Sequence, residues 1–210
     1  MKRLPLALLT LTLTLLLAAS ASALGLNVSY DEPIRCGEET TFTLTATDAG
    51  EDCMYYLNCI TLSYDGVFFD VLNNSTCAKS PFYTYRKDNT FSFTFMASGT
   101  YQMHFYVMDK TTLPAVTARK DITITISDNN YPTVETIADR IVAECKANTS
   151  NEYELALALH DYLINHTDYD YDLLYCHPEG VLVRGKGTCE AYQRAYGMLL
   201  NRAGITNTRA

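Results

Sequence analysis

The chain has 210 residues, with 24 aspartate and glutamate residues against 16 lysine and arginine residues, so its formal net charge is −8. This acidic balance argues against nucleic acid or an anionic membrane surface as the partner, because both bind basic proteins. The length is sufficient for two modest domains.

The first residues have the pattern of a signal peptide. Lys2 and Arg3 precede an apolar run over residues 4–18, and the small residues Ala21-Ser22-Ala23 fit the rule for signal peptidase. We therefore expect cleavage after Ala23 and a secreted or cell-surface protein with no membrane span after cleavage. The alternative is a retained membrane anchor, but the apolar run is shorter than a membrane-spanning helix, which needs about 20 residues. Without residues 1–23, the chain keeps 14 basic against 24 acidic side chains, a net charge of −10.

The seven cysteines suggest disulfide bonds if the protein is exported. A bond between Cys145 and Cys176, together with two bonds in the N-terminal half, would leave Cys189 as the free thiol. The N-terminal cysteines can pair in three ways, among which the sequence does not choose, and in a reducing compartment all seven would be thiols. The N-terminal cysteines are Cys36, Cys53, Cys59 and Cys77.

Residues 24–128 have the pattern of an antiparallel β-sandwich. Polar and apolar residues alternate along several short segments, which is typical of strands with one face in water. The segment from Gly99 to Ile126 resembles the closing hairpin of Ig-like and PKD-like modules of exported proteins, which implies an Ig-like sandwich. The expected strands are 41–46, 54–64, 91–95, 99–109 and 122–126.

Turn-forming residues and a proline at 128–132 mark a domain boundary, so a second domain is expected over 129–210. Its apolar residues recur with a helical period and predict three helices. Gly204 is the expected end of the third helix, and residues 205–209 are expected to begin a strand. The first helix has a stripe of Val134, Ile137, Ala138, Ile141, Val142 and Cys145; the second, capped by Asn151 with Glu154, has Leu155, Leu159, Tyr162, Leu163 and His166; the third, Cys189 to Ala203, has Tyr192, Tyr196, Leu199, Leu200 and Ala203.

Cys189 stands at the expected first turn of the third helix, behind Gly185 and Gly187. Backbone N–H groups at a helix start lack intrahelical partners and lie at the positive end of the helix dipole, so a thiolate there is stabilised. Cys189 is therefore the candidate nucleophile for attack on a carbonyl. The alternative, a small buried apolar residue, would suit a position in the middle of a helix better.

The four histidines are weaker candidates for a general base. His160 and His166 lie on the second helix, where a histidine is usually a core or interface residue, and His104 lies in an expected strand. His177 is nearer to the candidate nucleophile, but nothing gives it an orienting carboxylate. The acidic loop 168–172 lacks the glycine and closing glutamate of a calcium loop, so we expect a solvated turn and no metal.

Three segments of the second half resemble the transglutaminase-like superfamily, in the form common among exported bacterial proteins. They are the helix 156–163 with the trailing Tyr169-Asp170-Tyr171, the segment 180–189 with its Gly-Lys-Gly-Thr-Cys motif, and the helix 190–205 with its Leu-Leu-Asn-Arg-Ala-Gly-Ile ending. The resemblance implies a papain-type Cys-His-Asp group with Cys189 as the nucleophile and no cofactor. The family's histidine and aspartate come from strands after the nucleophile helix, where this chain has no residues. The resemblance thus implies a domain that is incomplete at its C-terminus and inactive as this chain.

The expected function is that of an exported acyl-transfer enzyme that forms a thioester on Cys189 with amides of protein or peptide substrates. Water as the acceptor gives peptidase or amidase chemistry and an amine gives crosslinking, and the sequence leaves this choice open. The alternative is a non-catalytic cell-surface binding or adhesion protein. In that case the β-sandwich binds a glycan or protein of the cell wall or surface, and the helical part is a degenerate scaffold.

Overall fold

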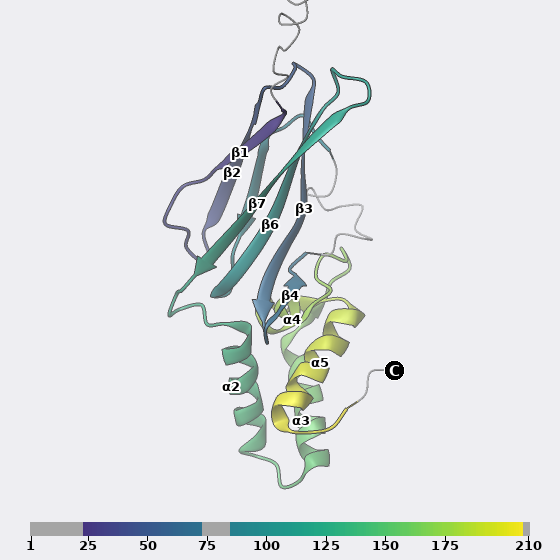
Figure 1. Ribbon diagram of the computed structural model, residues 1–210. Coiled ribbons are helices and arrows are strands. Elements are labelled where there is room, and N and C mark those ends of the chain that lie inside the picture. The colour runs from purple at the N-terminus through teal and green to yellow at the C-terminus, as the bar shows by residue number, and fades with distance from the viewer. Residues whose placement is uncertain (1–22, 73–84, 208–210) are drawn as a thin grey trace, which may run out of the picture.

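The structure is a computed structural model that describes residues 23–72 and 85–207. It has a β-rich N-terminal part followed by a helical part, which lie at opposite ends of an elongated molecule (Figure 1). Most of the expected signal peptide, Cys77 and residues 208–209 of the expected last strand lie outside the described residues. Within the described residues, none of the helices combines the length and apolar character that a membrane crossing requires.

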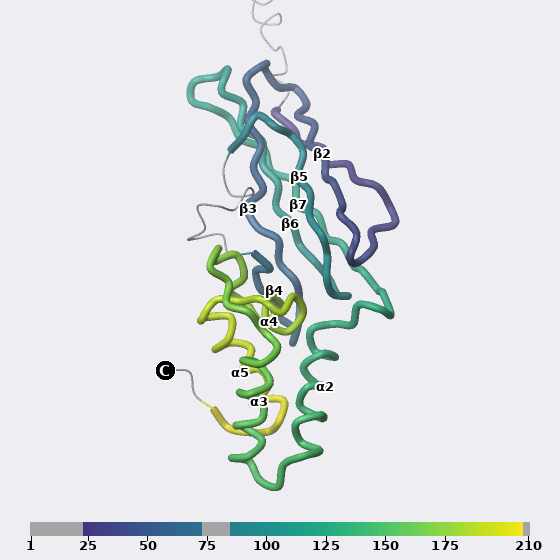
Figure 2. Tube along the Cα trace, turned by 180° about the vertical axis from the view of Figure 1, so that it is seen from behind, coloured from purple at the N-terminus to yellow at the C-terminus, as the bar shows by residue number. Residues whose placement is uncertain are grey.

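The N-terminal part consists of two antiparallel sheets with strand orders β1-β2-β5 and β4-β3-β6-β7. All five expected strands are present, with Phe95 falling just beyond its strand, whereas β1 and β4 were not expected as separate strands. The tube in Figure 2 shows the long central strands running the length of this part. The bounds are β1 (Gly25–Ser29), β2 (Glu39–Thr47), β3 (Cys53–Tyr64), β4 (Val67–Asp70), β5 (Thr90–Thr94), β6 (Gly99–Asp109) and β7 (Val116–Ile126).

Aromatic side chains fill the core of the β-rich part. Along β6, Tyr101, Met103, Phe105 and Val107 are fully buried and alternate with half-buried residues, as the pleat of a strand requires. The buried hydroxyl of Tyr101 donates a hydrogen bond of 2.8 Å to the carbonyl of Ala97. This bond fixes the corner at which the chain enters β6.

The first two expected helices are confirmed. α2 (Val134–Lys146) buries all six residues of its predicted stripe. α3 (Glu152–His166) begins at Asn151, whose side chain accepts a hydrogen bond of 3.0 Å from the backbone N–H of Glu154. Its buried residues are Leu155, Leu159 and Leu163, whereas Tyr162 is only half-buried and His166 is exposed.

The third expected helix, α5 (Cys189–Ala203), has the predicted bounds, and it buries the predicted Leu199 and Leu200 but not Tyr192, Tyr196 or Ala203. Its tyrosines are half-buried because their hydroxyls reach backbone carbonyls: Tyr192 donates to Thr167 and Tyr196 to Ala156. Small residues stand instead where α5 packs closely on its neighbours. The residues that α5 buries are Ala191, Ala195, Met198, Leu199 and Leu200.

The end of α5 agrees with the sequence, but the strand expected after it is not formed. Gly204 ends the helix with a φ of 80°, a left-handed conformation that glycine adopts freely. The expected strand is wrong for residues 205–207, which have no strand structure. The backbone N–H of Ile205 instead turns back to the carbonyl of Leu200 at 2.9 Å, which completes the helix cap.

Three short elements between α3 and α5 were not expected from the sequence. They are β8 (Asp168–Tyr169), α4 (Pro178–Leu182) and β9 (Lys186–Gly187), and β8 pairs with β9 in parallel. None is longer than five residues, so none carries enough residues for a periodic pattern. Together they form the turn that leads into α5.

The cysteines of the described residues are all free thiols, so the expected bond between Cys145 and Cys176 is not formed. Cys145 lies on the buried stripe near the end of α2, and Cys176 precedes α4. Figures 1 and 2 show that α2 ends far from the strands, whereas α4 lies beside them. The two thiols thus belong to opposite ends of the helical part.

Candidate functional site

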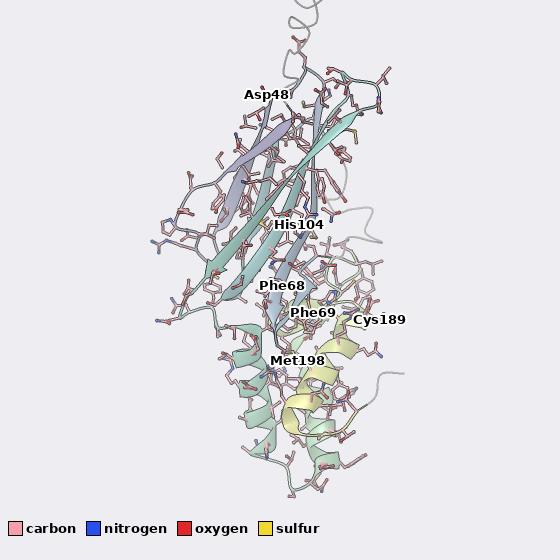
Figure 3. The ribbon with its side chains drawn as sticks, in the orientation of Figure 1. Asp48, Phe68, Phe69, His104, Cys189 and Met198 are labelled. Atoms are coloured by element: carbon pink, nitrogen blue, oxygen red, sulfur yellow. The ribbon has the colours of Figure 1, made fainter. Side chains whose placement is uncertain are left out.

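Cys189 is the first residue of α5, and its side chain is exposed. Thr188 caps the helix, because its hydroxyl accepts a hydrogen bond of 3.4 Å from the backbone N–H of Ala191. Figure 3 shows Cys189 at the end of α5 that is nearer to the strands. The position predicted from the sequence is confirmed, and the alternative of a buried apolar residue does not fit an exposed thiol.

Two glycines shape the turn that presents Cys189. Gly185 has a φ of +65°, which favours glycine. A Cβ atom on Gly187 would lie 2.5 Å from the Val181 side chain and 2.9 Å from the Cβ of Ala191. The backbone of β9 therefore approaches α4 and α5 more closely than any residue with a side chain would allow.

Backbone hydrogen bonds on both sides hold this turn in place. On one side, the N–H groups of Asp168 and Asp170 donate to the carbonyls of Gly185 and Gly187, at 2.8 and 2.9 Å. On the other side, the N–H of Thr188 donates to a carbonyl of the preceding loop at 2.9 Å. Cys189 is thus presented by a segment that is bonded along both edges.

Asp170 is the anchor of the acidic loop. It is fully buried and accepts hydrogen bonds from the backbone N–H groups of Asp172, Leu174 and Tyr175, at 3.1, 2.6 and 2.9 Å. The ammonium group of Lys186 lies 3.2 Å from the same carboxylate. The expectation of a simple solvated turn is therefore wrong at this residue. No group of three metal-ligating side chains occurs within residues 23–72 and 85–207.

Tyr169 is the residue of the site that the sequence did not single out. A hydrogen bond between its hydroxyl and the Cys189 sulfur is the main reason that the pKa of Tyr169 is raised above its ordinary value, because it favours the protonated phenol, and charge on the sulfur adds to the effect. The hydroxyl also interacts with the backbone N–H of Cys189. The one feature of the sequence that could have pointed to Tyr169 is its place in the Tyr-Asp-Tyr segment. That segment carries part of the family resemblance, but the resemblance gives it no chemical role.

Three of the four histidines are engaged elsewhere. The Nδ1 of His104 lies 2.7 Å from Asp121 on the β-rich part, the Nδ1 of His160 lies 3.0 Å from Asp161, and the Nδ1 of His166 lies 2.8 Å from a carbonyl of its own helix. His160 and His166 are nevertheless exposed, so the expectation that they are core or interface residues is wrong for both.

His177 lies closer to the site, on the residue that precedes α4. Its Nδ1 is 3.1 Å from the guanidinium of Arg194, which also binds the carboxylate of Glu190 at 2.5 Å. The ring of His177 packs against Phe69 of β4, with 5.7 Å between ring centroids. A cation therefore lies beside the Nδ1 of His177, in the place where a catalytic histidine would need a carboxylate.

A cavity of about 690 Å³ lies between the β3–β4 hairpin and α5. Its lining includes Tyr64 and Phe69 from the strands and Gln193 from the helix, four positions after Cys189. That spacing is about one helical turn, or about 6 Å along the axis. The hydroxyl of Tyr64 is buried and has no hydrogen-bond partner within the described residues. The cavity thus lies along α5 beyond Cys189, with aromatic and aliphatic walls interrupted by polar side chains such as Asp65 and Arg194, and it holds one unused polar group.

An exposed cysteine at the start of a helix, held by a glycine-rich turn with a phenol beside it, is an arrangement typical of cysteine nucleophiles. Residues 136–207 match the family model described as the transglutaminase-like superfamily. This part of the chain is therefore transglutaminase-like, as the resemblance implied. Comparison with curated proteins found no match.

Proposed function

We propose that the protein acts through Cys189 as a nucleophile that forms a thioester with amides of protein or peptide substrates. The observation that carries this proposal is the exposed thiol at the first residue of α5, where the helix dipole stabilises a thiolate. The backbone N–H of Cys189 is the first donor for the developing oxyanion. The second donor is the hydroxyl of Tyr169, which already interacts with this residue.

The acyl donor binds across the start of α5. The cavity lined by Tyr64, Phe69 and Gln193 holds an apolar part of the donor against its aromatic and aliphatic walls, while charged and amide side chains line the rest of it. The acceptor decides the reaction: water gives hydrolysis, and an amine gives crosslinking. Attack of the Cys189 sulfur on the amide carbonyl breaks the C–N bond and releases ammonia or an amine, which takes up the thiol proton. Attack on the thioester by water then returns the free thiol and an acid, and attack by a second amine returns the thiol and a new amide.

The test is direct detection of the acyl group on Cys189. The protein is incubated with an activated ester, such as p-nitrophenyl acetate, and digested with trypsin, which releases residues 187–194 as a peptide with one cysteine. We expect acetylation of this peptide at a rate above that of N-acetylcysteine, and its loss in Cys189→Ala. Added alkylamine that shortens the life of the acetyl group and yields an acetylated amine would assign amine transfer.

A wild-type rate no higher than that of N-acetylcysteine would overturn the proposal and favour the non-catalytic surface protein instead. Cys189→Ala should unfold at the wild-type temperature, because an exposed side chain at a helix start adds little packing. The variant therefore separates loss of chemistry from loss of folding.

The β-rich part and the N-terminal segment complete the proposal. The orders β1-β2-β5 and β4-β3-β6-β7 and the hydrogen bond from Tyr101 to Ala97 support an Ig-like sandwich with a tyrosine corner. Residues 1–23 support export as a secreted or cell-surface protein. N-terminal sequencing of the protein after expression with its own first residues tests export: a start at Leu24 agrees with it, and an intact Met1 contradicts it.

A further inference from the structure

A buried ion pair lies in the helical part just before the nucleophile, where it meets the β-rich part. The Nε of Arg184 donates to both carboxylate oxygens of Glu179, at 2.8 and 3.1 Å. The side chain of Glu179 is 1% exposed and that of Arg184 is 13% exposed. Burial raises the pKa of the Glu179 carboxyl, and the neighbouring Arg184 offsets part of this increase. The pair therefore lies in a site from which water is largely excluded.

Arg184 also reaches into the β-rich part. Its Nη2 donates a hydrogen bond of 3.1 Å to the carbonyl of Thr94, the last residue of β5. Its guanidinium lies 5.4 Å from the ring centroid of Phe93 and 5.2 Å from that of Tyr175. The carbonyl of Tyr175 in turn accepts the backbone N–H of Thr188, the residue before Cys189. One side chain thus connects β5, α4 and the loop that borders the nucleophile.

A buried ion pair is a weak source of stability, because desolvation of the two charges cancels most of their attraction. Apolar side chains of similar volume often give an equal or more stable fold. What the pair gives instead is a fixed geometry, since the planar guanidinium accepts few arrangements around its carboxylate and carbonyl partners. Only residues 185–188 separate Arg184 from Cys189, and they are bonded on both edges.

We propose that Arg184 is a positioning residue: by tying the end of β5 to Glu179 of α4, it fixes the turn that presents Cys189. The β-rich part is then a structural support of the nucleophile as well as a neighbouring domain. A test that measures the reactivity of Cys189 rests on the proposed function. The role of Arg184 therefore also needs a measurement that does not depend on this reactivity.

The test replaces the pair by apolar side chains of similar length, Glu179→Met with Arg184→Met. The control is Arg202→Met, because Arg202 also joins the two parts, through Asp65, but lies at the other end of α5. Iodoacetamide labelling of the tryptic peptide 187–194 measures Cys189, since this peptide is unchanged in all variants. Hydrogen exchange over residues 185–191 measures the turn, and thermal unfolding measures stability.

We expect the double variant to unfold at the wild-type temperature or above, with faster exchange over residues 185–191. Labelling of Cys189 should fall about tenfold, toward the rate of a free thiol. Arg184→Lys, with Glu179 intact, should label faster than the double variant but more slowly than the wild type. Arg202→Met should leave both labelling and exchange at wild-type values.

Wild-type exchange over residues 185–191 in the double variant would overturn the inference, as would an equal increase in Arg202→Met. If the wild-type thiol is no more reactive than N-acetylcysteine, the proposed function fails, and the exchange result alone decides the role of Arg184.

Discussion

The hydroxyl of Tyr169 interacts with both the thiol and the backbone N–H of Cys189, and the interaction with the thiol raises the pKa of Tyr169. A phenol with a raised pKa keeps its proton at neutral pH and can donate it in a hydrogen bond to the thiolate. Because β8 pairs in register with β9, Tyr169 lies opposite Gly187, two residues before the nucleophile. The two side chains are therefore brought together by the short parallel pair.

Tyr169→Phe should lower the reactivity of Cys189, because the thiolate loses a hydrogen-bond donor. We expect iodoacetamide labelling of peptide 187–194 to fall about threefold at pH 7.5, and acyl transfer to fall further if the hydroxyl also serves the oxyanion. Tyr171→Phe is the matched control, since Tyr171 is 84% exposed and its ring packs against that of Tyr169, with 5.0 Å between centroids. Equal labelling of wild-type protein and Tyr169→Phe would contradict the assigned role.

Asp170→Asn should destabilise the helical part by about 3 kcal/mol. The substitution removes the buried carboxylate that pairs with the Lys186 ammonium group, and it places an NH₂ donor where the backbone N–H groups need an acceptor. Urea unfolding followed by circular dichroism measures this loss. Asp172→Asn is the control at a half-buried position of the same loop and should change stability by less than about 0.5 kcal/mol. Similar losses in the two variants would show that burial of Asp170 is not what holds the loop.

Thr188→Ala should cost about 1 kcal/mol of stability, because the backbone N–H of Ala191 loses its cap. Thr188→Ser keeps the hydroxyl and should recover most of this loss. Both variants keep Cys189, so urea unfolding and labelling of peptide 187–194 can be measured on the same samples. A serine variant as unstable as the alanine variant would mean that the methyl group, rather than the cap, is the important contact.

Cys36 and Cys59 should be almost unreactive at neutral pH. Burial is the main reason that the pKa of each thiol is raised to about 11, with a nearby aspartate adding to it. A raised pKa favours the neutral thiol, so at pH 8 only about one thiol in a thousand is ionised. Labelling by iodoacetamide should rise about tenfold for each unit of pH up to about 10.

Guanidinium-denatured protein is the control for these two thiols, because unfolding removes the burial that raises their pKa. Peptide-resolved mass spectrometry should show rapid labelling of both cysteines in the denatured chain at pH 8. If the folded protein labels equally fast at that pH, the two sites are open to solvent and the burial is not maintained in solution.

The sequence by itself determined the elements whose patterns are local. The stripe from Val134 to Cys145, the cap at Asn151 and the stop at Gly204 follow from periodicity and from the backbone preferences of single residues. The placement of Cys189 at a helix start follows from Gly185, Gly187 and the helical pattern after them. The sequence of residues 136–207 also carries the transglutaminase-like resemblance, which the family model confirmed.

Only the tertiary structure decided which residues surround the thiol. Tyr169 reaches Cys189 because two strands of two residues each pair in parallel, and Arg184 meets Thr94 across 90 residues of chain. Asp170 is buried by its own loop, although its neighbours in sequence suggest a solvated turn. Cys145 and Cys176 are free thiols on separate elements, the first near the end of α2 and the second just before α4. Such contacts depend on packing between distant segments, which periodicity and residue preference within a segment do not encode.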